Sequence, residues 1–279
     1  IPENNHLKIS SCTVEKAYKE ISEKLFILDY PLLFLSHLKE VKFKIGNTTE
    51  IYERKIMDSQ EFDNNTLVEW LNLTQPDGQV QKLLLFSRKV DGRNYSVGFF
   101  FDDKNRLKPV ITPVFCYFPT KKETNLNFII HAPFLLTPNR EGIKAGEEHN
   151  IKMIDLLAIL AADSLIYLRD IGIKKGIRLI DDDILKIVPT NESGFNVSSD
   201  EISFKPFFTA IKHKMKSERL LPTRNGYVTA ENAYWADASK LTEIFSNEQL
   251  GLVVDNPQAT WVFTSIGARN AGDKANYIR

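Results

Sequence analysis

Apolar residues recur at helical spacing in three segments of the chain. In residues 13–40, Thr13 suits the N-cap position, and Pro31 begins a second helix or introduces a kink. The clearest helix is His149–Arg169, because its apolar residues form one continuous stripe, which a glycine- and lysine-rich stretch then ends. Phe204–Lys216 shows the same spacing. We expect these segments to be amphipathic helices.

A period of two, which is typical of strands, dominates the chain between the first and second helical segments. Val41–Ile45 alternates apolar and charged residues, so the stretch 32–45 predicts a short helix that runs directly into a strand. Val80–Val90 and Asn94–Asp102 flank Asp91-Gly92, a dipeptide that favours a tight hairpin.

The rest of this central region completes the predicted sheet. Further strands are expected over 109–118 and 126–136, with a Pro-Thr stop and a solvated turn between them. A short helix carrying Trp70 is expected over Asn65–Leu73, just before a turn at Gln75–Gly78. The central pattern predicts an α+β fold, a mixed sheet with helices on one face.

After Gly176 the pattern becomes more broken, and we place a domain boundary near residues 176–200. Asp181–Asp183 is expected to cap a short helix, because one turn offers too few oxygen ligands for a metal ion. Leu220–Val228 has the pattern of a strand, a turn and a strand. The elements expected beyond it are helices over Ala230–Trp235 and Ala238–Phe245 and strands over Leu250–Val254 and Thr260–Ser265. This part is predicted to be a smaller α/β segment.

Charge and composition exclude several classes of protein. Lys and Arg together number 36, as do Asp and Glu, so no overall field attracts nucleic acid or an anionic membrane. No apolar run reaches the roughly 18–20 residues that span a bilayer, and the beginning lacks a signal-peptide pattern. Cys12 and Cys116 lie far apart and suit buried thiols in a reducing compartment. We therefore expect a cytoplasmic protein without a membrane partner.

Arg140 lies where an apolar, strand-like stretch ends and a helical pattern follows. A planar guanidinium at such a turn can make bidentate, charge-assisted hydrogen bonds to a phosphate group. Lys144, one helical turn further on, would share that face. The alternative is that Arg140 and Glu141 only cover a surface turn, and the spacing alone favours that alternative.

A second concentration of positive charge lies between residues 205 and 224. With aromatic residues close by, it is the segment best suited to bind nucleic acid. Its cations are Lys205, Lys212, Lys214, Lys216, Arg219 and Arg224. A solvated helix face also explains them, and the zero net charge favours that explanation.

The residue spacings of several enzyme and metal sites are missing from the sequence. The five histidines show no ligand spacing, so no metal is expected. His131, within an apolar stretch, is expected to be a hydrogen-bonded core residue and not a catalyst. Neither Gly-x-x-x-x-Gly-Lys-Ser/Thr nor Gly-x-Gly-x-x-Gly occurs. We therefore expect no segment to hold a nucleotide on its own backbone.

Three segments together resemble bacterial sacsin-like proteins, which are large members of the GHKL ATPase superfamily to which the ninety-kilodalton heat-shock chaperone also belongs. The segments are LLFLSHLKEVKFKI (32–45), CYFPT…NFIIHAPFLLTPNREGI…HN (116–150) and LLPTRNGYVTAENAYWAD (220–237). The motifs of that family's ATP site are missing from the sequence. The resemblance therefore implies a fragment that lies just downstream of a Bergerat nucleotide-binding domain, and the start at Ile1 without Met fits that expectation.

For the fold, the resemblance implies a transducer, or middle, domain of ribosomal-S5-like α+β type. It divides the chain into a helical lead-in (1–45), the S5-like domain (46–176) and a further, incomplete α/β domain (177–279). In several relatives a basic side chain of the transducer domain reaches the γ-phosphate of ATP, a role that the resemblance gives to Arg140, with Lys144 as the second candidate. The fragment alone would need no cofactor and would be inactive, whereas the parent would bind ATP and Mg²⁺.

Under this interpretation the partner of the chain is the N-terminal ATP-binding domain of the same parent, with a client protein or a second copy as further partners. Its function would be to couple ATP binding to conformational change, as in a chaperone. Two other classes stay open. One is a nucleic-acid-binding module that uses residues 205–224, which salt-dependent binding would reveal. The other is a scaffold with exposed apolar faces, which self-association would reveal.

Overall fold

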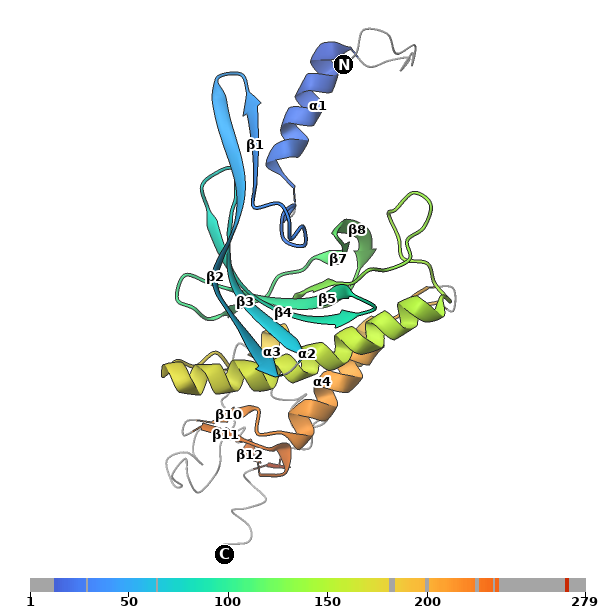
Figure 1. Cartoon of the computed structure of the whole chain (residues 1–279). Coiled ribbons are helices and arrows are strands. Elements are labelled where there is room, and N and C mark those ends of the chain that lie inside the picture. The colour runs from blue at the N-terminus through green and yellow to red at the C-terminus, as the bar shows by residue number, and fades with distance from the viewer. Residues whose placement is uncertain are drawn as a thin grey trace, which may run out of the picture.

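A computed structural model describes residues 13–235, apart from residues 29, 64, 181–183, 199–200, 224–225 and 233, and residues 269–270. Its centre is a nine-stranded sheet of order β1-β2-β3-β4-β5-β9-β7-β8, in which β6 also pairs with β5 (Figure 1). The strands of this sheet are β1 (Glu40–Ile45), β2 (Thr48–Asp63), β3 (Thr66–Thr74), β4 (Val80–Val90), β5 (Arg93–Phe101), β6 (Leu107–Lys108), β7 (Pro113–Cys116), β8 (Phe118–Glu123) and β9 (Ile129–His131). The β7–β9 pair is parallel and the other pairs are antiparallel, so the sheet is mixed, as predicted.

Helices and short strand pairs make up the other described elements. The helices are α1 (Val14–Phe26), α2 (Glu148–Lys175), α3 (Ile184–Ile187) and α4 (Lys205–Ser217), with single 3-10 turns η1 (Glu192–Phe195) and η2 (Ala230–Asn232). Two small pairs, β10 (Leu221–Thr223) with β11 (Gly226–Val228) and β12 (Tyr234–Trp235) with β13 (Arg269–Asn270), follow α4. The chain is therefore an α+β protein.

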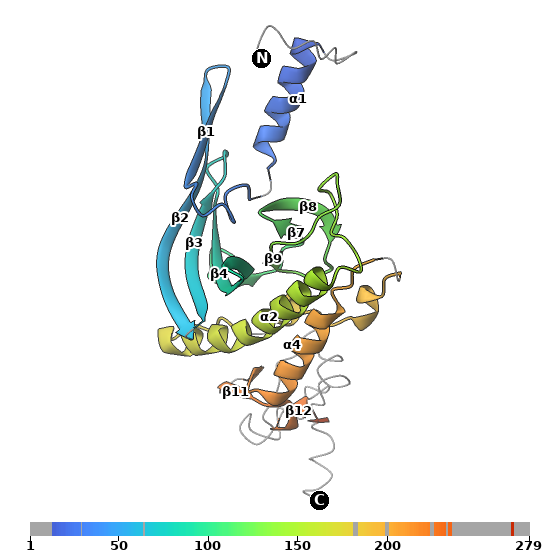
Figure 2. The same cartoon turned by 45° about the vertical axis from the view of Figure 1, so that its right-hand side comes forward.

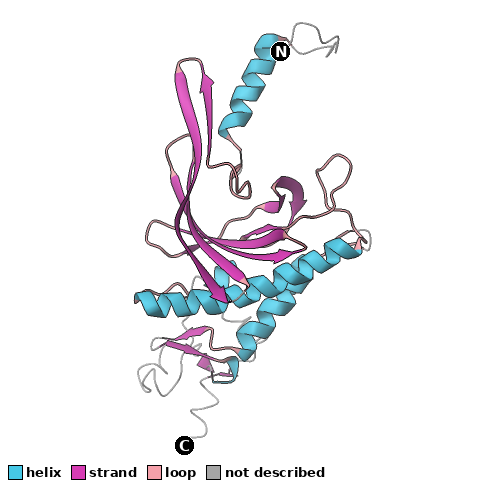
Figure 3. Ribbon diagram, in the orientation of Figure 1, coloured by secondary structure: helices cyan, strands magenta, loops and turns pink. Residues whose placement is uncertain are grey.

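One face of the sheet is covered by α2, and α4 packs against α2 (Figures 1, 2 and 3). The main core forms between these layers, because the strands turn apolar side chains such as Phe86 and Phe99 toward the buried stripe of α2, which includes Leu157 and Leu165. From α4, Phe207 joins the same cluster. The prediction of helical cover on one face of the sheet is confirmed for α2, and α4 forms a further layer on α2.

The opposite face carries a smaller apolar cluster. Its members come from the sheet and from the turn before β1, and they are Leu33, Phe34, Leu71, Leu73, Leu83, Leu85, Phe100, Phe115 and Ile129. The stretch 32–38 was predicted to be helical, and that prediction is wrong. It forms turns that bury Leu32, Leu33 and Phe34 in succession, and a run of consecutive buried residues imitates a helical pattern.

The first helix ends earlier than predicted and lies apart from the main layer. Thr13 is the N-cap of α1, as expected, because its side chain accepts the N–H of Lys16. No residue of α1 is buried. It contacts the β1–β2 hairpin through the rings of Phe26 and Phe43, whose centroids are 5.5 Å apart, and through the Tyr52 hydroxyl, which donates to the carbonyl of Leu25.

Local turn chemistry was predicted correctly at two places. Asp91 and Gly92 have φ of 50° and 75°, the left-handed conformation that a two-residue hairpin between β4 and β5 requires. Gly176 has φ of 66° and ends α2, where its N–H reaches the carbonyls of Gly172 and Ile173. The helix was expected to end at Arg169, but it continues through Gly172 to Lys175.

The helix expected over Asn65–Leu73 is wrong. These residues form β3, which pairs with β2 on one side and β4 on the other. Because both faces of this central strand are covered over much of its length, Val68 and Leu71 are both buried although they point to opposite faces. A strand with apolar residues on both faces lacks clear alternation, and this misled the pattern analysis.

The strands expected over 109–118 and 126–136 are shorter than predicted, as β7 and β9 show. Pro119 and Thr120 lie inside β8, where a stop was expected, because β8 is the outer strand of the sheet and its Pro119 can forgo a hydrogen bond there.

Strand β2 contains an irregularity that changes which side chains share a face. Ile56 pairs with Leu71, but Asp58 pairs with Trp70, so Met57 is an extra residue. As a result, Arg54 and Ile56 share the face of the smaller cluster, whereas the residues after Met57 alternate in the opposite phase.

A chain of charged groups connects the sheet to both main helices. Arg88 of β4 donates from Nε to the Thr66 hydroxyl at 2.7 Å and from Nη2 to Asp63 and Asp163, at 3.3 and 3.0 Å. Asp163 of α2 also pairs with Lys214 of α4 at 2.8 Å. Most of these charged groups are at least half-buried, so their hydrogen bonds and ion pairs add directional contacts to the apolar core.

Residues after Gly176 contribute to the main core as well. Leu179, Ile184 and Phe208 belong to the same cluster as the sheet, and the Tyr227 hydroxyl donates to the carbonyl of Ile180 at 2.7 Å. The division at 176–200 stays a prediction. The predicted strand–turn–strand is β10–β11, whereas the helix expected at Ala230–Trp235 is only the turn η2 before β12. The expected elements at 181–183, 238–245, 250–254 and 260–265 lie outside the described residues.

Candidate functional site

Arg140 lies at the tip of the loop that joins β9 to α2. The two sides of the loop meet through a bridge between Leu136 and Ile143, and the N–H of Thr137 donates to the carbonyl of Gly142 at 2.9 Å. Arg140 has φ of 60°, a left-handed conformation that suits the tight turn. In Figures 1 and 2 the loop projects away from α4.

Polar side chains of the loop fix its shape. The Thr137 hydroxyl donates to Asn139 Oδ1 at 2.7 Å and accepts the N–H of Gly142 at 3.0 Å. Glu141 is held from the neighbouring strand β8, where the N–H of Lys121 donates to its carbonyl at 2.7 Å and the Lys121 ammonium pairs with its carboxylate. The tip is therefore held by hydrogen bonds on both sides of Arg140.

The first turn of α2 holds the base of the loop. Asn150 is fully buried; its Oδ1 accepts the N–H of Leu135 at 2.8 Å, and its Nδ2 donates to the carbonyls of Leu135 and Lys144, each at 2.9 Å. His149 Nε2 lies 2.9 Å from the carbonyl of Pro133. One buried amide thus ties both sides of the loop to the long helix.

These hydrogen bonds fix the backbone of the loop and leave the guanidinium of Arg140 accessible to a ligand. The side chain is exposed, and it makes no hydrogen bond or ion pair with any residue in the described part of the chain. Lys144 does not continue a helix, since α2 begins at Glu148, so the predicted helical face shared with Arg140 is wrong. Lys144 lies on the side of the loop that returns to α2, and its N–H donates to the carbonyl of Leu135 on the side that leaves β9. The loop therefore presents the Arg140 guanidinium at its tip, and the exposed ammonium of Lys144 likewise has no side-chain partner in the described part of the chain.

Asn150 and His149 hold the candidate loop, and the sequence analysis missed them. They end the 116–150 segment that carries the family resemblance, but no role was inferred for them. Their partners are backbone groups 6 to 16 residues away, and such contacts leave no periodic signal.

His131 is a buried core residue, as predicted. Its Nδ1 lies 3.3 Å from the N–H of Tyr117 and from the carbonyl of Phe115, and its ring stacks on Phe34 at 4.3 Å. Burial lowers its pKa to about 4, so the imidazole is neutral at physiological pH. Cys116 of β7 is a buried free thiol, and burial raises its pKa, whereas Cys12 lies outside the described residues.

We expect the free energy of unfolding to fall by about 2 kcal/mol between pH 7 and pH 5 because of His131 alone. The unfolded imidazole binds a proton near its ordinary pKa of 6.5, while the folded one remains neutral down to about pH 4. The stabilisation is therefore complete above pH 6.5 and is lost as the pH falls. Urea unfolding at the two pH values should show a smaller fall for His131→Gln. An equal fall in both proteins would contradict the assignment of a neutral, buried His131.

Most cations of the 205–224 segment have partners within the protein. Lys205 pairs with Glu192 at 2.8 Å, Lys214 pairs with Asp163, and the Lys212 ammonium lies 5.5 Å above the ring of Phe208. Arg219 donates from Nε to the carbonyl of Tyr227 at 3.1 Å. Lys216 is exposed, and Arg224 lies outside the described residues. Much of the positive charge of this segment is therefore paired with groups around α4.

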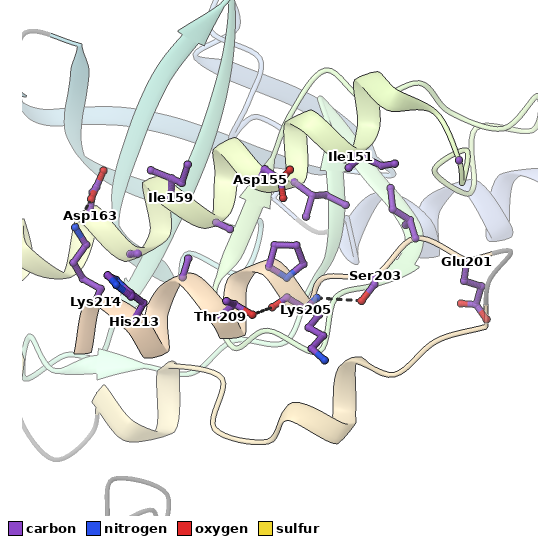
Figure 4. A pocket seen from close by; sticks show the side chains of 17 residues that line it. Ile151, Asp155, Ile159, Asp163, Glu201, Ser203, Lys205, Thr209, His213 and Lys214 are labelled. Atoms are coloured by element: carbon purple, nitrogen blue, oxygen red, sulfur yellow. Dashed lines mark hydrogen bonds and ion pairs between the residues drawn. The ribbon is translucent and has the colours of Figure 1, made fainter. Parts of the chain in front are cut away.

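A groove of about 1060 Å³ runs between the outer surfaces of the packed helices α2 and α4 along part of their length (Figure 4). Its walls are mainly apolar and include Ile151 and Ile159 of α2, each 50% exposed. Figure 4 shows Asp163 and Lys214 at one end and Glu201 toward the other. At the first of these ends, Lys214 of α4 pairs with Asp163 of α2 across the groove.

Two classes of site have no support in the described part of the chain. No group of three or more His, Cys, Asp or Glu side chains there could hold a metal ion. None of the helices described is both long and apolar enough to cross a bilayer.

No family model, curated protein or solved structure matches the chain.

Proposed function

We propose that the chain is the transducer domain of a cytoplasmic, sacsin-like and heat-shock-90-like GHKL ATPase, with an S5-like fold. In this proposal it couples ATP binding in a separate N-terminal domain to conformational change of the parent protein. The single observation that carries the proposal is the free guanidinium of Arg140 on a loop whose base is tied to α2 by Asn150. The segment that contains Arg140 is also the most specific part of the family resemblance.

A cation delivered by a second domain suits phosphoryl transfer. Negative charge spreads over the oxygens of the γ-phosphate in the transition state, and a pre-positioned guanidinium stabilises it. Positioning matters because small displacements of a catalytic group are costly. The hydrogen-bonded tip and the buried Asn150 meet this need, since they fix the backbone from which Arg140 extends. By resemblance, the N-terminal domain binds ATP and Mg²⁺.

In this proposal the long helix α2 connects the Arg140 loop to the later part of the chain. With 28 residues, α2 is about 42 Å long. Asn150 lies in its first turn, and Gly176 ends it next to the segment that leads to α3 and α4. A movement of the loop toward the nucleotide domain would move α2 and the packed α4 together, because Asp163 and Lys214 connect them. A client protein or a second copy of the chain would then respond to that movement.

The experiment that tests this function measures ATP binding and hydrolysis with separated parts. We expect the 279-residue chain alone to be inactive and to raise the ATP turnover of the parent's nucleotide-binding domain when it is added in trans. The Arg140→Ala chain differs from the wild type at this side chain alone, and its addition should not raise the ATP turnover of the nucleotide-binding domain. Hydrolysis by the chain alone, or no effect of the wild-type chain on the nucleotide domain, would refute the proposal.

A further inference from the structure

The sheet face opposite α2 contains an open pocket of about 820 Å³. Its floor is formed by β2, β3, β4, β5 and β9, and its walls come from residues 33–38 and Tyr117. The volume lies within the roughly 300–1,000 Å³ that is typical of small-molecule sites. It is separate from the Arg140 loop, since no residue of that loop lines it.

Polar groups lie side by side on the floor of this pocket. Ser87, Ser96 and His131 are direct cross-strand partners on β4, β5 and β9. The hydroxyls of Ser87 and Ser96 are 2.7 Å apart, and both side chains are buried. The neighbouring part of the same sheet face is the apolar cluster of Leu71, Leu83 and Phe100 described above. This polar row next to the apolar cluster places hydroxyl groups on the floor of the pocket, where a polar group of a ligand could meet them.

Arg54 of β2 also lines the pocket, and its hydrogen-bonding capacity is largely unused. Its side chain is only 7% exposed, and its contact with Glu69 is a single long bond of 3.4 Å from Nη2. Nε is buried and has no partner in the described part of the chain. A guanidinium has five N–H groups in a planar fork. A buried N–H group without a hydrogen-bond acceptor lowers the stability of the fold. This arrangement suits an anion that accepts from the fork.

Charge and apolar surface around the pocket define the ligand further. Lys89 and Arg93 are exposed at the rim, so with Arg54 three cations face the single carboxylate of Glu69 among the described lining residues. Apolar side chains line the other side: Leu38, Ile56 and Leu67 are 48%, 46% and 39% exposed. The pocket therefore combines a buried cation with an accessible apolar wall.

We propose that this pocket binds a small amphiphilic anion, with its carboxylate or phosphate monoester on Arg54 and its apolar part against Leu38, Ile56 and Leu67. The anion competes with Glu69 for the guanidinium, and the single long bond of 3.4 Å between Arg54 and Glu69 leaves room for that competition. This inference is independent of the proposed ATPase function, because it involves none of the residues that present Arg140.

The test uses the whole chain with hexanoate and hexyl phosphate as probes, followed by calorimetry and by the backbone amide signals of Ser87, Ser96 and Tyr117. We expect at least one of these anions to bind at millimolar concentration and to shift those signals, and the one that binds identifies the head group. Hexanol, which has the apolar part without the anion, should bind at least tenfold more weakly. Equal binding of hexanol, or no shift with either anion, would overturn the proposal.

Two variants separate ligand recognition from a purely structural ion pair. Glu69→Gln removes the competing carboxylate, so the affinity for the anion should rise about fivefold. Arg54→Gln/Glu69→Gln removes both charges together, which avoids leaving a buried carboxylate unpaired, and should lower the affinity at least tenfold. The exposed pair Arg106 and Asp102, changed to Arg106→Gln/Asp102→Asn, is the matched control and should leave binding unchanged. Unaltered affinity in Glu69→Gln and in the double variant would show that Arg54 is structural.

Discussion

Under the proposed ATPase function, replacing Arg140 with alanine in the proposed parent protein is expected to lower ATP turnover by about 100-fold while nucleotide affinity changes by less than about threefold. The guanidinium is exposed and has no hydrogen-bonding or ion-pair partner in the described part of the chain, so its removal should not disturb the fold. Its effect should therefore fall on the step in which charge develops on the γ-phosphate. Steady-state turnover and equilibrium binding of a fluorescent ATP analogue measure the two quantities separately.

Matched substitutions in the same loop make this result specific. Lys144→Ala removes the second candidate cation and should leave turnover within about threefold of the wild type. Arg140→Lys keeps the charge but loses the planar fork, so it should restore only part of the activity. If Lys144→Ala abolishes turnover and Arg140→Ala does not, the role belongs to Lys144. If neither matters, this loop does not contact the nucleotide.

Asn150→Ala is expected to lower the free energy of unfolding by about 3 kcal/mol, the largest effect on stability that we predict for a single polar side chain. The substitution removes three hydrogen bonds at a fully buried position and takes the Asn150 partner from the N–H of Leu135 and the carbonyl of Lys144, whereas the carbonyl of Leu135 keeps its bond from the N–H of Lys144. Urea unfolding of the 279-residue chain measures this directly. In the parent, the same substitution should also lower turnover, because the backbone that carries Arg140 loses its support.

The control for Asn150 is Asn139, which makes hydrogen bonds of similar length in the same loop but is exposed. Asn139→Ala should cost less than about 1 kcal/mol, since water replaces the lost partners. Equal losses for the two variants would mean that burial of Asn150 does not matter and that the loop is held by other contacts.

The parts of the fold that depend on local chemistry were predictable from the sequence. The apolar stripe of α2, the Gly176 terminus and the Asp91-Gly92 hairpin each follow from residues close together in the chain. Strand β3 was not predictable in this way. Both of its faces are covered, so Val68 and Leu71 are both apolar and buried although they point to opposite faces, and the sequence does not alternate between apolar and polar residues. Burial of Leu33 and Phe34 in a turn likewise depends on the distant sheet.

The same distinction applies to the residues to which we propose a function. Arg140 was singled out because a proline-containing break after an apolar stretch is visible in the sequence. The anchoring by Asn150 was not visible, since its partners are backbone groups of Leu135 and Lys144. Arg54 was missed as well. Its meeting with Glu69 depends on the pairing of two strands, which no short motif encodes.

The extra residue in β2 has a consequence for how this chain can change in length during evolution. Between Arg54 and Gln60, strand β2 has one residue more than the partner segment from Leu73 to Val68. Loss of one residue from positions 55–59 would therefore give a regular ladder, and Arg54 and Gln60 would both stay on their present faces. A homologous chain can thus be one residue shorter in this short segment and still keep both layers of the sheet.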